Sequence, residues 1–240
     1  MSRLDEILVC AELIQANRKE GLPDFSGDGE YLVQYSVGQL TSKLGTREDD
    51  SENTFTARLL LLLESRPLLG DAVYDKALNK VIEAYWRDYT DRKDRFSPSF
   101  LANDILRLWR TLCVNYEKSE GDNKKIKNYK LRHSRILTCF SALAYFAMIM
   151  RKNKTVTPED AFRISKLSPT ERVEKIAQAP ELEEKARSSA REVLKAYEGF
   201  IENPDGANDE FPDREDALGK EMFTLLQSID ADRFSRHLLV

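Results

Sequence analysis

The chain has 240 residues, of which 41% are hydrophobic and 32% are charged, and its formal net charge at pH 7 is −4. This composition is sufficient for a hydrophobic core and is typical of a soluble helical protein. The 3 scattered cysteines and 2 histidines have no metal-ligand spacing, which argues against a disulfide framework and against a structural zinc site. Unpaired cysteines indicate a reduced compartment, so we expect a cytoplasmic protein.

The first predicted element is a helix over residues 2–19, capped by Ser2, whose apolar stripe consists of Leu4, Ile7, Leu8, Ala11 and Ile14. An acidic residue at position 5 interrupts any uncharged core, so no signal peptide is expected. Residues 20–29 are rich in glycine and proline and are predicted to be a loop. Residues 30–37, EYLVQYSV, are the only candidate strand, but the sequence offers no partner strand for them.

Three amphipathic helices are predicted next. The first opens near Thr54 and ends before Pro67, because proline disfavours helical geometry in the residue that precedes it. The second covers residues 71–89 and the third residues 97–117, each with apolar side chains at three- and four-residue steps. Aromatic rings on these apolar faces can stack on nucleic-acid bases, but core positions are the expectation for Trp86, Trp109 and Tyr116.

Residues 124–151 are predicted to form one long helix with a basic first half and an apolar second half. The apolar run, residues 136–150, has 15 residues. At about 1.5 Å per residue it reaches about 22 Å, short of the ~30 Å hydrocarbon core of a bilayer. We therefore expect a buried central helix and no association with a membrane.

The last part of the chain is predicted to contain further helices. Thr157 and Ser168, each followed by proline, are start signals for two of them, and Glu171 completes a capping box with Ser168. A charged helix over residues 180–202 follows.

An acidic, turn-rich linker over residues 203–216 then precedes a C-terminal helix over residues 217–240. With residues 1–51 as an N-terminal region and residues 52–202 as a helical core domain, the predicted fold is all-α. We expect an irregular bundle of about eight or nine helices.

Positive charge is concentrated where the third amphipathic helix meets the long helix. Residues 107–135 contain nine Lys and Arg and three acidic residues, a net charge of +6 in a chain whose total is −4. Antiparallel packing of the two helices would place their cationic faces across a groove, where Arg and Lys bind phosphates. The predicted phosphate-binding residues are Asn103, Arg107, Arg110, Lys127, Lys130, Arg132 and Arg135.

Other interpretations of these charges stay open. The basic run is equally consistent with a solvated helix surface, and His133 within it is either a phosphate donor or a surface histidine. A metal-binding role for Asp49, Asp50 and Glu52 would be required of a complete transferase, although a solvated connector also explains these acids. The sequence has no GxSxG, HExxH or P-loop motif. No intrinsic cofactor is expected, and an Mg-nucleotide is a candidate ligand.

Three blocks, ENTFTARLLLLLESRPLL, FLANDILRLWRTLCVNYE and KNYKLRHSR, resemble in their order the helical region of bacterial nucleotidyltransferase-like proteins related to the DNA polymerase β superfamily. The resemblance covers about residues 52–150. It implies helices whose polar residues contact the base, ribose or triphosphate of a nucleotide beside a catalytic sheet. The carboxylates that hold two Mg²⁺ ions in that superfamily, and the Gly-Ser or Gly-Gly turn before them, are not found here.

Two hypotheses follow. In the first, the chain is a non-catalytic or partial nucleotidyltransferase-like protein that binds a nucleotide, or the phosphate backbone of RNA or DNA, in the basic groove. In the alternative, it is a structural or interaction subunit of a cytoplasmic complex and binds a protein partner or a second copy of itself. An enzyme made from this chain alone is the least favoured reading, because the sheet that would support its carboxylates is missing.

Overall fold

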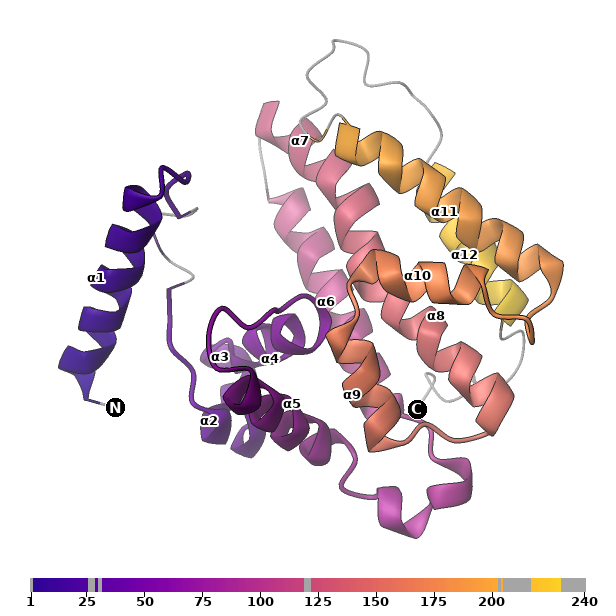
Figure 1. The fold of residues 1–240 in the computed structure, drawn as a ribbon, viewed down its shortest axis with the longest axis horizontal. Helices are drawn as coiled ribbons and strands as arrows, with labels where there is room; N and C mark the ends of the chain where they lie inside the picture. The colour runs from indigo at the N-terminus through magenta and orange to yellow at the C-terminus, as the bar shows by residue number, and fades with distance from the viewer. Residues whose placement is uncertain are drawn as a thin grey trace.

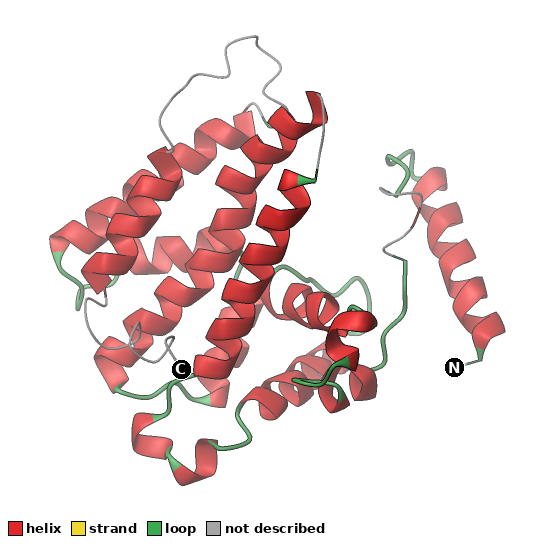
Figure 2. Ribbon diagram, turned by 180° about the vertical axis from the view of Figure 1, so that it is seen from behind, coloured by secondary structure: helices red, strands yellow, loops and turns green. Residues whose placement is uncertain are grey.

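A computed structural model describes residues 2–25, 29, 32–118, 122–202, 204 and 217–229 (Figure 1). All regular structure within these ranges is helical, so the predicted all-α fold is confirmed (Figure 2). The elements are α1 (Arg3–Lys19), α2 (Val37–Ser42), α3 (Glu48–Ser51), α4 (Thr54–Leu63), α5 (Asp71–Tyr85), η2 (Tyr89–Asp91), η3 (Lys93–Arg95), α6 (Ser99–Glu117), α7 (Asp122–Lys130), η4 (Leu131–Arg135), α8 (Ile136–Asn153), α9 (Pro158–Lys166), α10 (Pro169–Ala177), α11 (Glu184–Glu202) and α12 (Ala217–Ile229).

The chain has more helices than expected, because two short ones, α2 and α3, occupy segments that were predicted to be strand and connector. The candidate strand is not formed among its described residues: residues 32–36 are an extended loop and Val37 begins α2, while residues 30 and 31 lie outside the described ranges. A capping box explains the start of α2, since Ser36 Oγ accepts the Gln39 N–H at 3.2 Å and Gln39 Oε1 accepts the Ser36 N–H at 2.8 Å.

The predicted long helix is confirmed, because α7, η4 and α8 are continuous. The middle segment, η4, is a π-helix, in which the backbone hydrogen bonds skip one residue more than in an α-helix. By length and composition Lys124–Asn153 could cross a membrane, but 67% of its most apolar window is buried in the structure. The buried core helix of a globular protein meets the same criterion of length and composition, and most residues of α8 are buried in the core.

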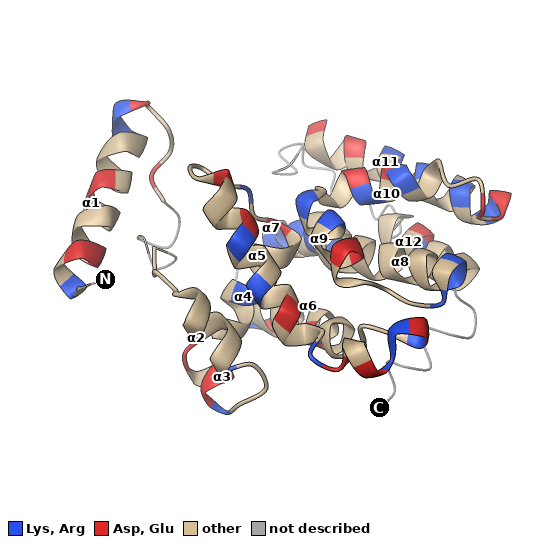
Figure 3. Cartoon of the chain, turned by 60° about the horizontal axis from the view of Figure 1, so that its bottom comes forward, with Lys and Arg blue, Asp and Glu red and all other residues tan. Residues whose placement is uncertain are grey.

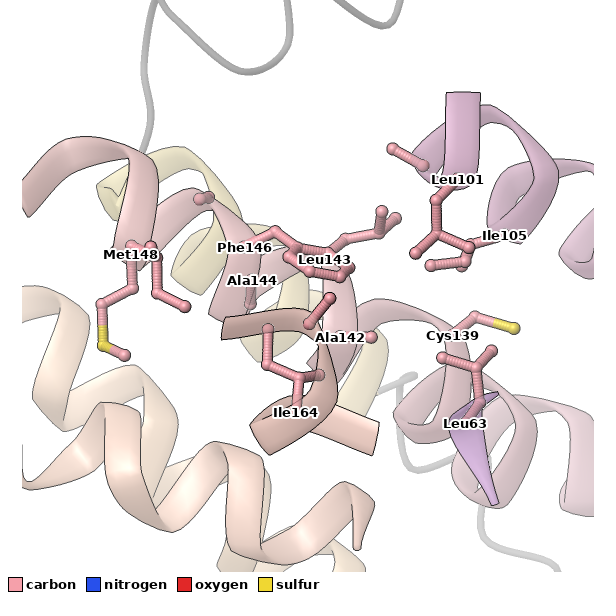
Figure 4. Close-up of a cluster of buried hydrophobic side chains, with 14 of the residues drawn as sticks. Leu63, Leu101, Ile105, Cys139, Ala142, Leu143, Ala144, Phe146, Met148 and Ile164 are labelled. Carbon is pink, nitrogen blue, oxygen red and sulfur yellow. The ribbon is translucent and has the colours of Figure 1, made fainter. Parts of the chain in front are cut away.

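The core is built around α8. It packs against α6, α10 and α12, and α12 in turn packs against α11. Figure 4 shows side chains from three helices meeting here: Leu101 and Ile105 of α6, Leu143 and Phe146 of α8, and Ile164 of α9. Trp86 occupies a core position, as expected: it is buried, and its Nε1 donates to the Val156 carbonyl at 2.9 Å. Trp109 is half-buried and packs edge-on against Phe140 with ring centroids 5.4 Å apart, and Tyr116 is half-buried beside Lys124 of α7.

The helix starts read from the sequence are present. Ser168 Oγ accepts the Glu171 N–H at 3.2 Å, and Thr157 Oγ1 accepts the Asp160 N–H at 3.1 Å. Ser2 caps α1 in the same way, with Asp5 completing the box. The acidic linker, residues 203–216, lies outside the described residues apart from Pro204.

Helix α1 stands apart from the other helices, on the left in Figure 1. The view from behind shows the same separation (Figure 2). A loop that passes through residues 32–36 leads from it to α2. The rest of the N-terminal region does not share this isolation, because α2 packs against α4 and α5, and α3 packs against α4.

Candidate functional site

The predicted groove depends on how α6 is rotated about its axis. Helix α6 turns Trp109 toward Phe140 of α8, and it turns Tyr116 toward α7, where Lys124 Nζ lies 5.2 Å from the ring centroid. Successive residues of an α-helix are rotated by about 100°, so Arg107 and Arg110 cannot face the same way as Trp109. The structure therefore does not place the arginines of α6 opposite the lysines of α7.

Arg107 is held by carboxylates of the chain itself. Its guanidinium forms an ion pair with Asp50 of α3, lies 3.6 Å from Asp104 of its own helix, and is stacked 4.0 Å above the ring of Phe55 of α4. These contacts fix α6 against α3 and α4. They also neutralise the charge on which the predicted phosphate site depended.

Arg135 is likewise engaged. Its Nη1 lies 3.2 Å from both carboxylate oxygens of Glu64, at the end of α4, and Thr138 of α8 donates to the same carboxylate. His133, two residues earlier, is half-buried: its ring stacks on Phe200 of α11 with centroids 5.2 Å apart, and its Nδ1 lies 2.8 Å from the Tyr129 carbonyl oxygen. Neither a phosphate donor nor a plain surface histidine describes this packed position.

The remaining predicted residues are half-buried or exposed. Asn103 is half-buried on α6, and Arg110 of the same helix is exposed. Lys127 and Lys130 are exposed on α7, and Arg132 is exposed on η4. Figure 3 shows basic and acidic residues interspersed along the helices of the body. Asp50 and Glu64 pair with Arg107 and Arg135, so these two members of the predicted groove are engaged within the chain, and phosphate binding by the other members stays a prediction.

The most extensive polar site is buried between α3, α4, α5 and α6. It consists of Asp49, Thr54, Arg58, Tyr85 and Asp104, and is called the Arg58 network below. Arg58, whose side chain is 0% exposed, makes a bidentate pair with Asp49 at 2.6 and 2.9 Å. Its Nε donates to the Tyr85 hydroxyl at 2.9 Å, and Tyr85 donates in turn to Asp104 at 2.6 Å.

Charge states in the Arg58 network follow from its geometry. Burial disfavours the ionised form of Asp49, but hydrogen bonds from Arg58 and Thr54 outweigh it and hold the pKa of Asp49 below its usual value. Burial raises the pKa of Asp104 above its usual value, against the hydrogen bond from Tyr85. Burial and the neighbouring Asp104 carboxylate raise the pKa of Tyr85, so its hydroxyl keeps its proton.

The three acids that the sequence offered as candidate metal ligands, Asp49, Asp50 and Glu52, each have a basic partner. Asp49 is paired with Arg58, Asp50 with Arg107, and Glu52 with Lys43. Within the described residues there is no group of three His, Cys, Asp or Glu side chains that could hold a metal ion. Each of the three carboxylates therefore pairs with a basic side chain in this structure.

A second buried arginine joins α10 to α4 and α9. Arg172 is 0% exposed, and it donates from Nη2 to the Leu63 carbonyl at 2.8 Å and from Nε to the Ile164 carbonyl at 3.1 Å. Its Nη1 has no hydrogen-bond partner among the described residues. Burial without a paired carboxylate lowers the pKa of Arg172 to about 10. The carbonyl contacts indicate a role in holding helix ends together.

Helix α1 has a different kind of surface. None of its 17 residues, all of which the structure describes, is buried. Leu4, Ile7 and Leu8 are 74%, 52% and 60% exposed and form one stripe, called the α1 stripe below. Another side of the helix is covered by its own connecting loop: Cys10 Sγ donates to the Leu32 carbonyl at 3.2 Å, and Gln34 Nε2 donates to Cys10 Sγ at 2.8 Å.

A second set of exposed apolar residues lies at the turn between α4 and α5. Leu68, Leu69 and Val73 are 81%, 90% and 73% exposed, and they are called the turn patch below. Exposed leucines are ordinary when they are isolated, but contiguous apolar groups on a surface mark interaction sites. The sequence predicted the α1 stripe as an apolar face and placed Val73 on the apolar face of its helix, but it gave Leu68 and Leu69 no role.

Comparison of the chain with protein-family models, with curated proteins and with solved structures gives no match. The resemblance to nucleotidyltransferase-like proteins therefore stays a prediction. What distinguishes the candidate sites is their geometry: two buried arginine centres that join helices, and two apolar surfaces that lack a packing partner within the described part of the chain.

Proposed function

We propose that this chain is an interaction subunit that docks onto another polypeptide through α1. The observation that supports this proposal is the α1 stripe: Leu4 and Leu8 are 74% and 60% exposed, and Ile7, at the edge of the hollow between α1 and its own loop, is 52% exposed. Residues at i, i+3 and i+4 are the anchors by which an amphipathic helix binds in an apolar groove.

The energetics of an isolated helix favour this reading. Helices of this length are marginal in water without tertiary packing, because most helical stability in proteins comes from burying an apolar face. Burial of one leucine or isoleucine side chain contributes about 1.5–3 kcal/mol. Three such side chains contribute about 4.5–9 kcal/mol, which is of the same order as the cost of association, about 4–15 kcal/mol, so a stable complex requires further contacts beside the stripe.

The test is photo-crosslinking in cells from a benzoylphenylalanine placed at position 8. A matched control carries the same group at Lys185, an exposed residue of α11. We expect a covalent product from position 8 that is not formed from position 185, and mass spectrometry identifies the chain to which it is joined. Equal products, or none, from the two positions would refute docking through α1.

A second candidate function, binding of a polyanion such as RNA or DNA, is favoured by a separate observation. Arg110, Lys118, Lys125 and Arg132 are exposed, and none of them has a carboxylate partner among the described residues. Phosphate contacts of this kind make affinity fall steeply with salt. The double variant Lys125→Glu with Arg132→Glu should lose binding to transfer RNA and flatten its salt dependence. Lys185→Glu with Lys195→Glu, on α11, is the control, and equal losses from the two pairs would exclude this function.

A further inference from the structure

We infer that the polypeptide bound at α1 adds a β-strand to residues 32–36. This inference rests on the proposed function and names the form that the partner takes. These residues, LVQYS, belong to the only candidate strand of the sequence, and the structure leaves them extended, with no second strand within the described ranges. A strand preference that the described chain does not satisfy indicates that another chain supplies the neighbouring strand.

The segment has the backbone geometry that strand pairing requires. None of its residues has a positive φ, and Ser36 at its end has a φ of −74° and a ψ of 151°. In an extended chain the N–H and C=O of one residue point to the same edge, and those of the next residue point to the opposite edge. Residues 32, 34 and 36 therefore share one edge, and residues 33 and 35 share the other.

The edge that carries residues 32, 34 and 36 is closed at both ends by the chain itself. The Leu32 N–H donates to the Gly29 carbonyl at 2.9 Å, and the Leu32 carbonyl accepts Cys10 Sγ at 3.2 Å. Both backbone groups of Ser36 are used by the start of α2. This edge therefore offers an added strand only the backbone groups of Gln34.

The opposite edge is open. The N–H and C=O groups of Val33 and Tyr35 form no hydrogen bond within the described part of the chain. Val33 is 57% exposed, and the segment crosses from α1 to α2 outside the packed helices (Figure 1). Natural proteins protect such an edge with lysine, proline or a covering element, and residues 32–36 contain no charged residue and no proline.

These backbone groups define the chemistry of the occupant. An apolar surface such as the turn patch does not specify what covers it. By contrast, donor and acceptor pairs two residues apart match the main chain of an extended polypeptide, which exchanges hydrogen bonds with every second residue. Main-chain bonds of this kind supply contacts beside the α1 stripe.

A hollow that Val33 lines indicates the side chain that the added strand carries. It has a volume of about 210 Å³, lies between α1 and the segment, and has Ile7 and Leu32 in its walls. Arg3 and Glu6, which also line it, pair with each other at 3.0 Å, so the hollow presents no net charge. Alternate side chains of an added strand enter pockets on one face. We therefore expect an apolar residue of the partner in this hollow, in contact with Ile7 of the α1 stripe.

Amide hydrogen exchange, resolved by residue with NMR, tests the pairing. The probe is a peptide selected from a random phage-displayed library on the immobilised full chain. When it binds, exchange of the Val33 and Tyr35 amides should slow by at least about tenfold, and that of Gln34 by less than about threefold, because every second amide faces the added strand. A bound peptide that leaves positions 33 and 35 unprotected, or a selection that yields no peptide, would overturn the inference. Protection of these amides in the chain alone, rising with its concentration, would assign the edge to a second copy and overturn it as well.

Proline substitution tests the same edge in cells. Val33→Pro removes an N–H from the open edge, whereas the control, Gln34→Pro, removes one from the closed edge. The control also removes the contact of Gln34 with Cys10, so it disturbs the loop more than Val33→Pro does. Unchanged circular dichroism should show that both variants fold. With the photo-crosslinking group at position 8, we expect the product to fall at least about fivefold in Val33→Pro and less than about twofold in Gln34→Pro.

The outcomes separate this inference from the proposed function. Equal yields from the two proline variants overturn the added strand and leave docking through α1 in place. If position 8 gives no product in the chain without a proline substitution, docking through α1 is refuted and the inference fails with it.

Discussion

Replacing Arg58 by methionine is the most direct test of how the fold is held together. The guanidinium is fully buried and supplies hydrogen bonds to Asp49, to the Tyr85 hydroxyl and to the Leu40 carbonyl. Arg58→Met would leave a buried carboxylate without its cation, and removal of one partner from such a pair costs about 3–5 kcal/mol. In a chain of this size that loss lowers the melting temperature by about 6–20 °C.

The effect should depend on pH in a defined direction. Hydrogen bonds from Arg58 and Thr54 hold the pKa of Asp49 below its usual value in the folded chain, against the effect of burial. A lowered carboxylate pKa contributes stability that is complete above the unfolded value, about 3.9, and is lost as pH falls through the folded value. The difference between the original chain and Arg58→Met should therefore be largest near pH 7 and shrink below about pH 4.

Urea unfolding followed by circular dichroism at 222 nm measures this difference. The control is Lys80→Met, which removes an exposed ion pair with Glu83 and should change the free energy of unfolding by less than about 0.5 kcal/mol. The double variant Asp49→Leu with Arg58→Met should be less destabilised than the sum of the single variants by at least about 1 kcal/mol. A value for Arg58→Met within about 1 kcal/mol of the original chain at pH 7, or strict additivity, would refute the reasoning.

Three further outcomes are expected. Ser168→Ala removes the acceptor of the Glu171 N–H and should lower the free energy of unfolding by about 1 kcal/mol in urea. Trp86→Phe leaves the buried Val156 carbonyl without its donor and should cost about 1–3 kcal/mol by the same measurement. Burial raises the pKa of Cys139 to about 12, so mass spectrometry should find iodoacetamide at pH 8 only on the partly exposed Cys10 and Cys113, with Cys139 labelled after unfolding.

The parts of the fold that sequence predicted well are those fixed by local chemistry. Thr157 and Ser168 mark helix starts because a side-chain oxygen followed by proline satisfies free backbone N–H groups whatever the rest of the chain does. The apolar run of α8 indicates its own burial for a similar reason. Ser36 with Gln39 was an equally local signal for α2, and the β-branched and aromatic residues around it concealed it.

The site could not be predicted in the same way, because it depends on contacts between distant segments. Nothing in the spacing of Arg107 reveals that Asp50, 57 positions earlier, lies beside it. The same holds for Arg135 and Glu64, which are 71 positions apart. For α1 the apolar stripe was visible in the sequence. A stripe predicts that an apolar surface packs against it, but it does not tell whether that surface is another part of the same chain or another chain.

The π-helical turn at Leu131–Arg135 sets the angular offset between the two halves of the long helix. A π-bulge behaves as a single inserted residue, which rotates everything on one side of it by about 100° relative to an unbroken α-helix. Deleting one residue within the turn would swing the lysines of α7 a quarter-turn around the axis while α8 stayed locked in the core. The direction in which the lysines of α7 point therefore depends on η4, whereas the packing of α8 in the core does not. Deleting or inserting one residue in η4 can rotate α7 without changing how α8 packs.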